Sequence, residues 1–260
     1  MDNCLRKSVC SSLEAKISER FFPILKTLGA PDCVLNRVEN EFFFRFAQSP
    51  QVALSHLRDE LHKTGLRDSW NEVLNNARST YLARLIAPYV EGVTMDLLCG
   101  DGALAIELEK RTGQPTYLVE RQKDVLNPWR PWFNRILPFG SADASLEGLD
   151  PDTIVLSTVL HHELFPRDLI RAAADKTQKK LVIIENCIDE VYDAEYQVFV
   201  DLFFNTCLNQ TSLGSPGAHL REEEWTVIFY EFGFSRVDVV ERSTQVPGIP
   251  LSHTVMVASK

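Results

Sequence analysis

A short apolar run that ends in a glycine turn limits the fold of this chain more than any other feature. Residues 95–102 read M-D-L-L-C-G-D-G, and the amphipathic run A-L-A-I-E-L-E follows directly. This order predicts a strand, a tight turn and the start of a helix, where free backbone N–H groups can meet a nucleotide-like ligand. The acidic residue Glu120 closes the next apolar run, 20 residues beyond Gly100. A carboxylate there can accept hydrogen bonds from both hydroxyl groups of a ribose, so the segment predicts a Rossmann-like site for an adenosine-containing molecule.

From Val93 onward, short apolar runs alternate with amphipathic ones, which predicts parallel strands joined by crossover helices. We expect strands at 93–98, 116–120, 153–157 and 180–185, helices at 102–112 and 165–177, and a loop rich in Pro and Trp at 127–138. The stretch 189–232 is helical at both ends around a break at 212–217. Two last strands, at 236–241 and 253–258, are expected to form an antiparallel hairpin at the sheet edge.

The first 91 residues have the periodicity of helices and little that predicts a strand. Apolar stripes recur at helical spacing, and the longest of them runs from Trp70 to Tyr89 and leads into the first strand. We therefore expect a helical N-terminal cap region at 1–91 and a second domain at 92–260. Aromatic clusters at 42–44 and 203–204 predict that the cap packs on the 189–232 segment, or that an aromatic pocket lies between the two.

Composition excludes several classes of protein. The net charge of −9 argues against a surface that tracks nucleic-acid phosphates. The six cysteines are scattered without a C-x-x-C pair, which is typical of a reducing compartment and gives no sign of a metal site. No secretion signal and no apolar run of about 18 residues is present, so we expect a soluble, cytoplasmic protein that does not bind membranes. A homodimer stays open as the assembly state.

The charges around the turn distinguish two ligands. The spacing Gly100-x-Gly102-x-x-Ala105 fits a loose dinucleotide fingerprint, which would predict NAD or FAD. However, Asp96 and Asp101 bracket the turn and would place carboxylates beside a pyrophosphate. S-adenosylmethionine carries a sulfonium and an ammonium group, which carboxylates attract. The turn therefore favours S-adenosylmethionine.

The turn also resembles the first motif of class I S-adenosylmethionine-dependent methyltransferases, and later segments resemble that family in the same order. These segments are S-A-D-A-S around Asp143, D-T-I-V-L-S-T-V-L-H-H at 152–162, K-L-V-I-I-E-N at 180–186, a run ending in Gly-Phe at 220–234, and H-T-V-M-V-A-S at 253–259. The resemblance covers about residues 93–260. It implies an α/β fold with a Rossmann-like sheet, mostly parallel with a C-terminal antiparallel hairpin, beside the N-terminal helical cap. It also implies S-adenosyl-L-methionine as cofactor, bound by Asp96, Gly100, Asp101, Gly102, Glu120 and Asp143.

Within that family, the closest resemblance in the chemical residues is to small-molecule O-methyltransferases of the plant caffeate type. Those enzymes carry a catalytic histidine after the fourth strand, and His161 matches it; Glu185, at the end of the next strand, matches the glutamate that orients the histidine. A histidine suits removal of a hydroxyl proton, and a carboxylate on one ring nitrogen raises the basicity of the other. The sequence L-H-H-E replaces the usual H-D-W, and a second flanking glutamate has no counterpart. The implied partner is a small-molecule acceptor.

Alternative interpretations remain for each of these residues. The glycines could serve tight strand-to-helix packing without a ligand, and the acids at strand ends could be solvated. Asp143 could be a turn former, and His161 and His162 could line a pocket without moving a proton. His219 is expected in a surface loop. For the whole chain, the alternatives are a cofactor-binding regulator or partner subunit without turnover, and an NAD-dependent oxidoreductase.

Overall fold

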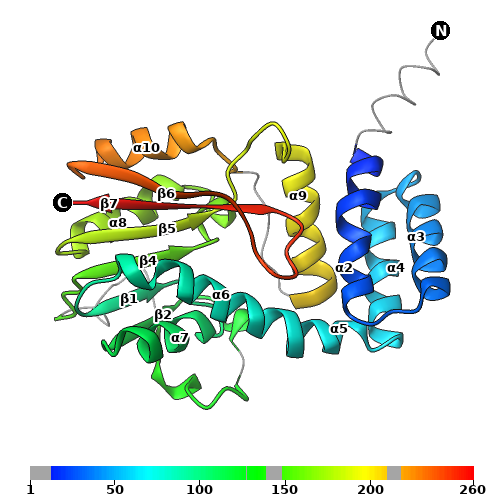
Figure 1. Cartoon of the computed structure of the whole chain (residues 1–260), viewed down its shortest axis with the longest axis horizontal. Coiled ribbons are helices and arrows are strands. Elements are labelled where there is room, and N and C mark those ends of the chain that lie inside the picture. Colours follow the sequence, from blue (N-terminus) through cyan, green and yellow to red (C-terminus); the bar gives the residue numbers. More distant parts are fainter. Residues whose placement is uncertain (1–12, 127, 139–147, 210–217) are drawn as a thin grey trace, which may run out of the picture.

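The structure is a computed structural model that describes residues 13–126, 128–138, 148–209 and 218–260. Asp143 and the expected break at 212–217 lie outside the described residues. The chain forms a helical N-terminal part beside a twisted sheet that is covered by helices on both faces (Figure 1). None of the helices in these ranges combines the length and the apolar character needed to cross a lipid bilayer.

Seven strands form one sheet in the order β3-β2-β1-β4-β5-β7-β6. Their bounds are β1 Thr94–Leu97, β2 Thr116–Glu120, β3 Ile136–Pro138, β4 Thr153–Ser157, β5 Lys180–Glu185, β6 Arg236–Gln245 and β7 Ser252–Ser259. The first five strands pair in parallel, whereas β7 pairs antiparallel with both β5 and β6. This confirms the predicted mostly parallel sheet with a C-terminal antiparallel hairpin. The strand order reverses between β1 and β4, the place at which open α/β sheets bind ligands.

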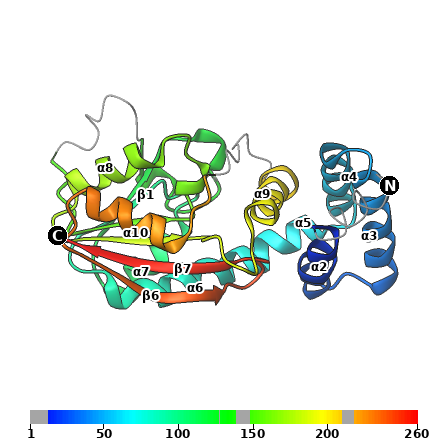
Figure 2. The same cartoon turned by 90° about the horizontal axis from the view of Figure 1, so that it is seen from above.

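Helices form a layer on each face of the sheet (Figure 2). Alternate residues of the central strands face these two layers. Ile154 and Ile183 face a core that includes residues of α8 and α10, whereas Val155 and Val182 face one that includes residues of α6 and α7. The bounds of these helices are α6 Asn76–Ile86, α7 Ala103–Thr112, α8 Pro166–Lys176 and α10 Glu222–Glu231. The central strands β4 and β5 therefore bury both of their faces, which explains why they appear in the sequence as continuous apolar runs.

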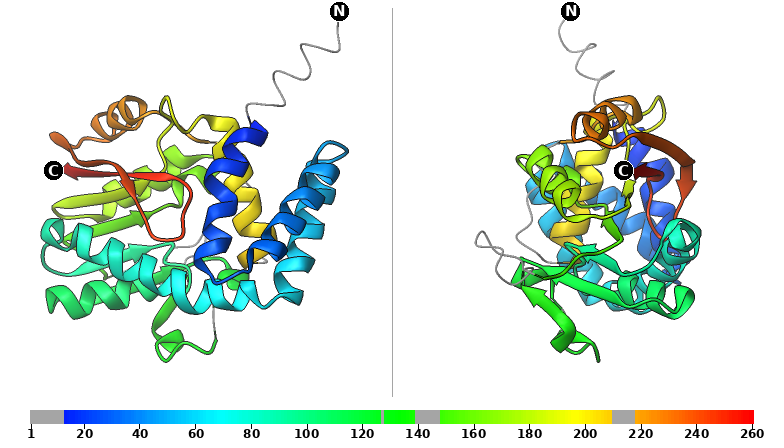
Figure 3. Two further views of the ribbon diagram at one scale, coloured as in Figure 1. Left: turned by 45° about the vertical axis from the view of Figure 1, so that its right-hand side comes forward. Right: turned by 90° about the vertical axis from the view of Figure 1, so that its left-hand side faces the viewer.

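The remaining helices form a bundle at one end of the sheet (Figures 1 and 3). They are α2 Phe22–Thr27, α3 Asp32–Phe46, α4 Pro50–Lys63, α5 Leu66–Ser69 and α9 Ala194–Phe203, with π-helical turns at Ile17–Phe21, Trp70–Asn75 and Phe204–Asn209. Short 3-10 turns lie at Ala87–Tyr89, Lys123–Val125, Phe133–Arg135 and Leu160–His162. Ser49 and Pro50 set the start of α4, because the Ser49 hydroxyl oxygen accepts from the backbone N–H of Val52 and Pro50 fits the first helical position.

Aromatic packing joins the N-terminal helices to α9. The rings of Phe21 and Phe203 lie 4.2 Å apart between centroids, and Phe42 packs on Phe199 at 6.0 Å. Phe42 is fully buried, whereas Phe44 is 70% exposed. The expected packing of the cap on the 189–232 segment is therefore observed, and it uses only part of the 42–44 cluster.

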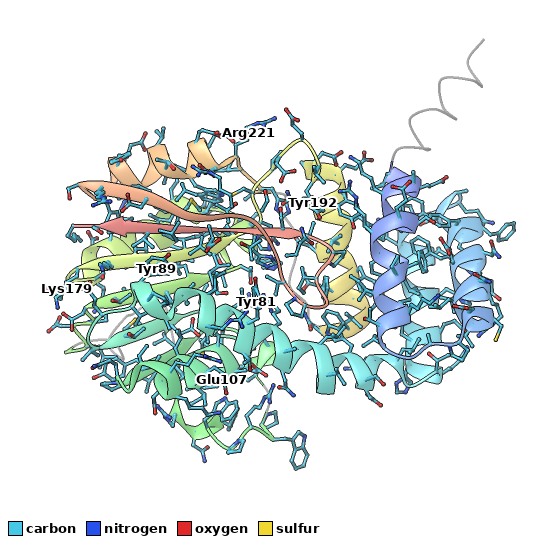
Figure 4. The ribbon with its side chains drawn as sticks, in the orientation of Figure 1. Tyr81, Tyr89, Glu107, Lys179, Tyr192 and Arg221 are labelled. Atoms are coloured by element: carbon cyan, nitrogen blue, oxygen red, sulfur yellow. The ribbon has the colours of Figure 1, made fainter. Side chains whose placement is uncertain are left out.

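Tyr192 adds a polar link between the same parts of the molecule. The Arg20 guanidinium lies 4.9 Å above its ring, and its hydroxyl accepts a hydrogen bond from the Gln245 side chain at 3.1 Å. The ring, labelled in Figure 4, thus connects the N-terminal helices to the end of β6.

Two sequence expectations differ from the structure. The segment 127–138, expected to be a loop, ends in β3, which pairs with β2 over Leu118–Glu120. Three residues, one of them proline, are too short a run to give a strand signal without the neighbour that supplies the hydrogen bonds. The expected strand at 236–241 is also too short, because β6 continues to Gln245 through two register shifts against β7.

Candidate active site

A cavity of about 710 Å³ opens beyond the carboxyl ends of β1, β2, β4 and β5. Residues of α5, α6, the Phe204–Asn209 turn and the β6–β7 connection complete its wall. Leu98 and Thr158, which follow β1 and β4, line the cavity and have φ angles of 63° and 53°. Non-glycine residues in this left-handed region cost energy and cluster at functional sites, so the backbone itself marks this edge of the sheet.

The glycine turn and Glu120 meet at one end of the cavity. The backbone N–H of Gly100 donates to Glu120 Oε2 at 2.8 Å, and the other carboxylate oxygen accepts from the backbone of Arg121 and Gln122 at 2.8 and 2.9 Å. Glu120 is only 6% exposed, and burial raises its pKa. The structure therefore holds a carboxylate at the position the sequence predicts for ribose recognition.

Asp96 lies at the same end and has an unusual environment. It is 1% exposed, and its Oδ2 has no hydrogen-bond partner among the described residues. Burial, followed by the nearby charges of Glu120 and Asp101, raises the pKa of Asp96 to about 7. A buried carboxyl oxygen without a partner carries a large desolvation cost, which a ligand donor would remove.

Asp101 serves the turn and the loop that follows β2. Its Oδ1 accepts from the backbone N–H of Ala103 at 3.0 Å, and its Oδ2 accepts from Arg130 Nε at 2.8 Å. Its carbonyl accepts from the Trp132 indole at 2.7 Å. Asp101 lines the cavity, but the guanidinium of Arg130 already neutralises its charge. Trp132 thus anchors this loop to the glycine turn, whereas Trp129 is 92% exposed.

Gly102 allows the glycine turn to pack closely against the sheet. Its φ is +78°, and a Cβ there would lie 2.5 Å from Leu118 Cδ2. We expect Gly102→Ala to lower the free energy of unfolding by more than the roughly 1–3 kcal/mol that a left-handed alanine costs alone. Denaturant unfolding measures this loss.

Gly113 provides the matched control, since its φ is +68° and a Cβ added there would meet no atom within 4 Å among the described residues. Gly113→Ala carries the backbone cost without the clash. Equal losses in the free energy of unfolding for Gly102→Ala and Gly113→Ala would show that the contact with Leu118 does not require glycine at position 102.

His161 lies in the short Leu160–His162 turn that follows β4, and its ring is held between two carboxylates. It is 2% exposed, and Glu185 is fully buried. His161 Nδ1 lies 2.6 Å from Glu185 Oε2, while the other Glu185 oxygen accepts from the backbone N–H of Leu160 at 2.8 Å. On the opposite edge of the ring, Nε2 lies 3.6 Å from Asp201 Oδ1, which is beyond hydrogen-bond distance. The structure thus brings together the two residues that the sequence assigns to proton chemistry and adds a third.

The pKa values of the residues in this cluster differ strongly from their ordinary values. Burial lowers the pKa of His161, but the carboxylates of Glu185 and Asp201 outweigh it and raise the pKa to about 9. Burial raises the pKa of Asp201, but His161 and the other histidines outweigh that effect and lower it to about 2. The pKa of Glu185 is also lowered, against its burial, by His161. At neutral pH the cluster therefore holds an imidazolium between two carboxylates.

Two further histidines border the cluster. His162 lines the cavity, and its ring centroid lies 4.1 Å from that of His161. His219, expected in a surface loop, is instead 4% exposed with Nε2 3.1 Å from Asp201 Oδ2. That expectation was wrong because the sequence does not show that Asp201 packs over this segment. Ligand atoms of His161, His162 and Asp201 lie within 4.8 Å of one another, which is close enough for a metal ion.

Three other cavity residues were missed by sequence reasoning. Arg78 on α6 donates to the Thr158 hydroxyl at 2.7 Å, and its buried Nε has no partner among the described residues. His253 on β7 is 1% exposed, its Nδ1 has no partner in the same part of the chain, and burial lowers its pKa to about 3. Asn186, directly after β5, has an Oδ1 that is likewise unpartnered within the described ranges.

Some of these residues have a sequence signal. Arg78 lies four positions before Leu82 on the apolar stripe of α6, and Asp201 interrupts the apolar run V-F-V-D-L-F-F. A charge on an apolar helix face is rarely buried without a partner or a function. His253 and Asn186 have no comparable signal, because each lies among polar residues at a strand end, where polar side chains are common.

Comparisons with known proteins support the fold. No protein-family model matches the sequence, and neither does any curated protein. Among solved structures, an O-methyltransferase family protein from Burkholderia thailandensis aligns with a TM-score of 0.51 and 16% identity, over 77% of this chain and 61% of its own. The mitomycin 7-O-methyltransferase MmcR aligns with a TM-score of 0.50 and 18% identity, over 89% and 69%.

A third structure is CalO1, a methyltransferase in calicheamicin biosynthesis that was solved in its SAH-bound form. It aligns with a TM-score of 0.50 and 14% identity, over 78% of this chain and 59% of its own. The chain thus spans about three fifths of the length of the Burkholderia and calicheamicin proteins. The fold is that of Rossmann-like class I methyltransferases, as the resemblance in the sequence implied.

Proposed function

We propose that this protein is an S-adenosylmethionine-dependent methyltransferase that methylates a hydroxyl group of a small molecule, with His161 as the proton acceptor. The observation that carries the proposal is one cavity that joins a carboxylate-bearing glycine turn to a buried histidine between two carboxylates. The solved structures that share this fold and are described as O-methyltransferases support it.

The residues at the turn fit this cofactor. Glu120 can accept the ribose hydroxyl groups, and the unpartnered oxygen of Asp96 can accept from a cationic or hydroxyl donor. Gly100 and Gly102 keep the turn free of side chains, and Asp101 positions it through Arg130. Asp143, in the expected adenine loop, remains a proposal from the resemblance.

Arg78 fits the one anionic group of the cofactor. Its guanidinium is deeply placed in the wall of the cavity, where burial lowers its pKa, and its side chain donates to the neutral hydroxyl of Thr158. A guanidinium without a carboxylate partner is costly to bury, and a ligand carboxylate would relieve that cost. We assign Arg78 to the α-carboxylate of S-adenosylmethionine.

Arg78→Met should therefore weaken S-adenosylhomocysteine binding by roughly 10- to 100-fold, the value of a hydrogen bond to a charged group. Calorimetry measures the change. Arg84→Met is the matched control, because Arg84 lies on the same helix, is exposed and covers the Tyr81 ring, labelled in Figure 4. A Kd within twofold of the parent for Arg78→Met would remove this residue from the cofactor site.

His161 can take the acceptor's proton only at Nε2, because Nδ1 is held by Glu185. The cofactor, when bound, supplies a methyl group on a positively charged sulfur, so the acceptor oxygen gains a bond to carbon as the carbon–sulfur bond breaks. Glu185 fixes the ring and, together with Asp201, stabilises the imidazolium that forms. Both carboxylates are positioning residues in this scheme.

Turnover tests the proposal. Incubation with S-adenosylmethionine carrying a labelled methyl group and a panel of small hydroxylated acceptors should give a labelled product and S-adenosylhomocysteine. Added EDTA should leave the rate of methyl transfer unchanged. Loss of activity on chelation would instead indicate that the histidine cluster binds a metal ion. Cofactor binding without transfer to any acceptor would favour the regulator or partner-subunit alternative. A cytoplasmic location is a further expectation, and a homodimer stays open as the assembly state.

A further inference from the structure

The arginines of the cavity wall fall into two pairs. Among the described residues, four arginines line the cavity. Arg121 and Arg130 each pair with a carboxylate of the protein. Arg67 and Arg78 have no described carboxylate within ion-pair distance, although the chain carries a net charge of −9. Two guanidinium groups of the cavity wall are therefore open to anionic groups of ligands.

Arg67 is held in a fixed orientation. It begins on α5 and reaches across to the Phe204–Asn209 turn, where its Nε donates to the carbonyl of Leu208 at 3.0 Å. No hydrogen bond from its two terminal nitrogens to a described residue is present. A guanidinium fixed at Nε presents those terminal N–H groups as a fork, the geometry that binds a carboxylate or a phosphate through two hydrogen bonds.

The surroundings of Arg67 indicate the rest of the ligand. The cavity wall also includes apolar side chains from the Phe204–Asn209 turn and from the connection between β6 and β7. These are Phe204, Leu208, Ile249 and Leu251. Asp201, a buried carboxylate of the wall, has His161 and His219 within ion-pair distance. His253 adds a buried imidazole whose Nδ1 no described residue contacts through a hydrogen bond. A carbon frame with one oxyanion and at least one hydroxyl group would satisfy this set.

The charge of the cofactor leaves one of the two guanidinium groups without a partner. The cofactor carries one carboxylate, which Arg78 serves, so the guanidinium of Arg67 stays available for a second oxyanion. We propose that the acceptor is a small hydroxy compound with an apolar frame and a carboxylate or phosphate group held by Arg67. This inference rests on the proposed function for the identity of the cavity as the site of methyl transfer.

Matched probes test the charge requirement. We would measure the Kd values of 3-hydroxybenzoate, 3-hydroxybenzamide and phenyl phosphate by calorimetry, with and without saturating S-adenosylhomocysteine. The acid should bind roughly 10- to 100-fold more tightly than the amide, because a charge-assisted pair is lost in the amide. Tighter binding of phenyl phosphate than of the acid would identify the oxyanion as a phosphate ester. Equal affinities for acid and amide would overturn the proposal.

Variants assign the effect to Arg67. In Arg67→Gln, the Kd values of the acid and the amide should lie within about twofold of each other. Arg67→Lys should retain part of the preference for the acid, because the positive charge remains but the two parallel N–H donors are lost. Arg58→Gln is the control, since Arg58 lies on α4 and pairs with Asp59 outside the cavity. An unchanged preference in Arg67→Gln would contradict the proposal.

The two proposals fail separately in this experiment. Cofactor binding by Arg67→Gln is measured on the same samples and should stay within twofold of the parent, which also shows that the variant is folded. If the parent binds the acid selectively but not S-adenosylhomocysteine, the proposed function fails while the anion site stands. If it binds the cofactor but no oxyanion, the inference about the acceptor is wrong.

Discussion

His161→Ala should lower kcat by roughly 10²- to 10⁴-fold, the usual contribution of a positioned general base. The Kd for S-adenosylhomocysteine should stay within about twofold, because the described contacts of His161 are with Glu185, Asp201 and neighbouring histidines and not with the glycine turn or Glu120. This separation of turnover from binding is what distinguishes a proton acceptor from a residue that shapes the cofactor site. Steady-state kinetics and calorimetry on the same preparation measure the two effects.

Two variants accompany this experiment. His56→Ala is the control, because His56 lies on α4 and pairs with Glu41 away from the cavity. Glu185→Gln keeps the size of the side chain but removes the charge that stabilises the imidazolium, so its kcat should fall between those of the parent and His161→Ala. Full turnover by His161→Ala would remove the residue from the base role and leave it as a wall of the pocket.

The pH dependence of kcat/KM should be equally large. The pKa of His161 is about 9, and only the neutral imidazole can accept a proton. The active fraction is therefore small at neutral pH and increases with pH. We expect kcat/KM to rise about tenfold per pH unit between pH 6 and 8, to reach half of its maximum near pH 9 and to level off above that pH. A cationic cofactor near the ring would move the midpoint towards lower pH.

Asp201→Asn separates this effect from ionisation of the acceptor itself. The variant removes one of the two carboxylates that raise the pKa of His161, so the midpoint should move to lower pH. His56→Gln should leave the profile unchanged. A midpoint that stays in place in Asp201→Asn would mean that a group other than His161 controls the rise.

The fold and the part of the cavity around the glycine turn could be predicted from local sequence patterns. The run from Met95 to Gly102 predicts its own strand, turn and helix, and the position of Glu120 at the end of the next strand follows from the alternation of strands and helices. Because the carboxyl ends of neighbouring parallel strands meet at one edge, Glu120 comes within 2.8 Å of Gly100. The same reasoning places His161 beside Glu185.

The other end of the cavity could not be predicted in this way. Asp201, Arg67 and His219 come from helices and loops whose packing on the sheet is set by side chains of the N-terminal bundle, such as Phe21 on Phe203. No periodicity in one segment specifies which face of another it contacts. Asp201 therefore stood in the sequence as a lone acid in an apolar helix, and its two histidine partners appear only in the structure.

The central claim is that this cavity binds S-adenosylmethionine rather than a dinucleotide, and calorimetry with S-adenosylhomocysteine and with NAD⁺ tests it most directly. We expect saturable one-to-one binding of S-adenosylhomocysteine that is lost in Glu120→Ala. We expect no binding of NAD⁺, because the buried carboxyl group of Asp96 lies beside the turn where a pyrophosphate would bind. Binding of NAD⁺ in place of S-adenosylhomocysteine, or of neither compound at millimolar concentration, would contradict the account.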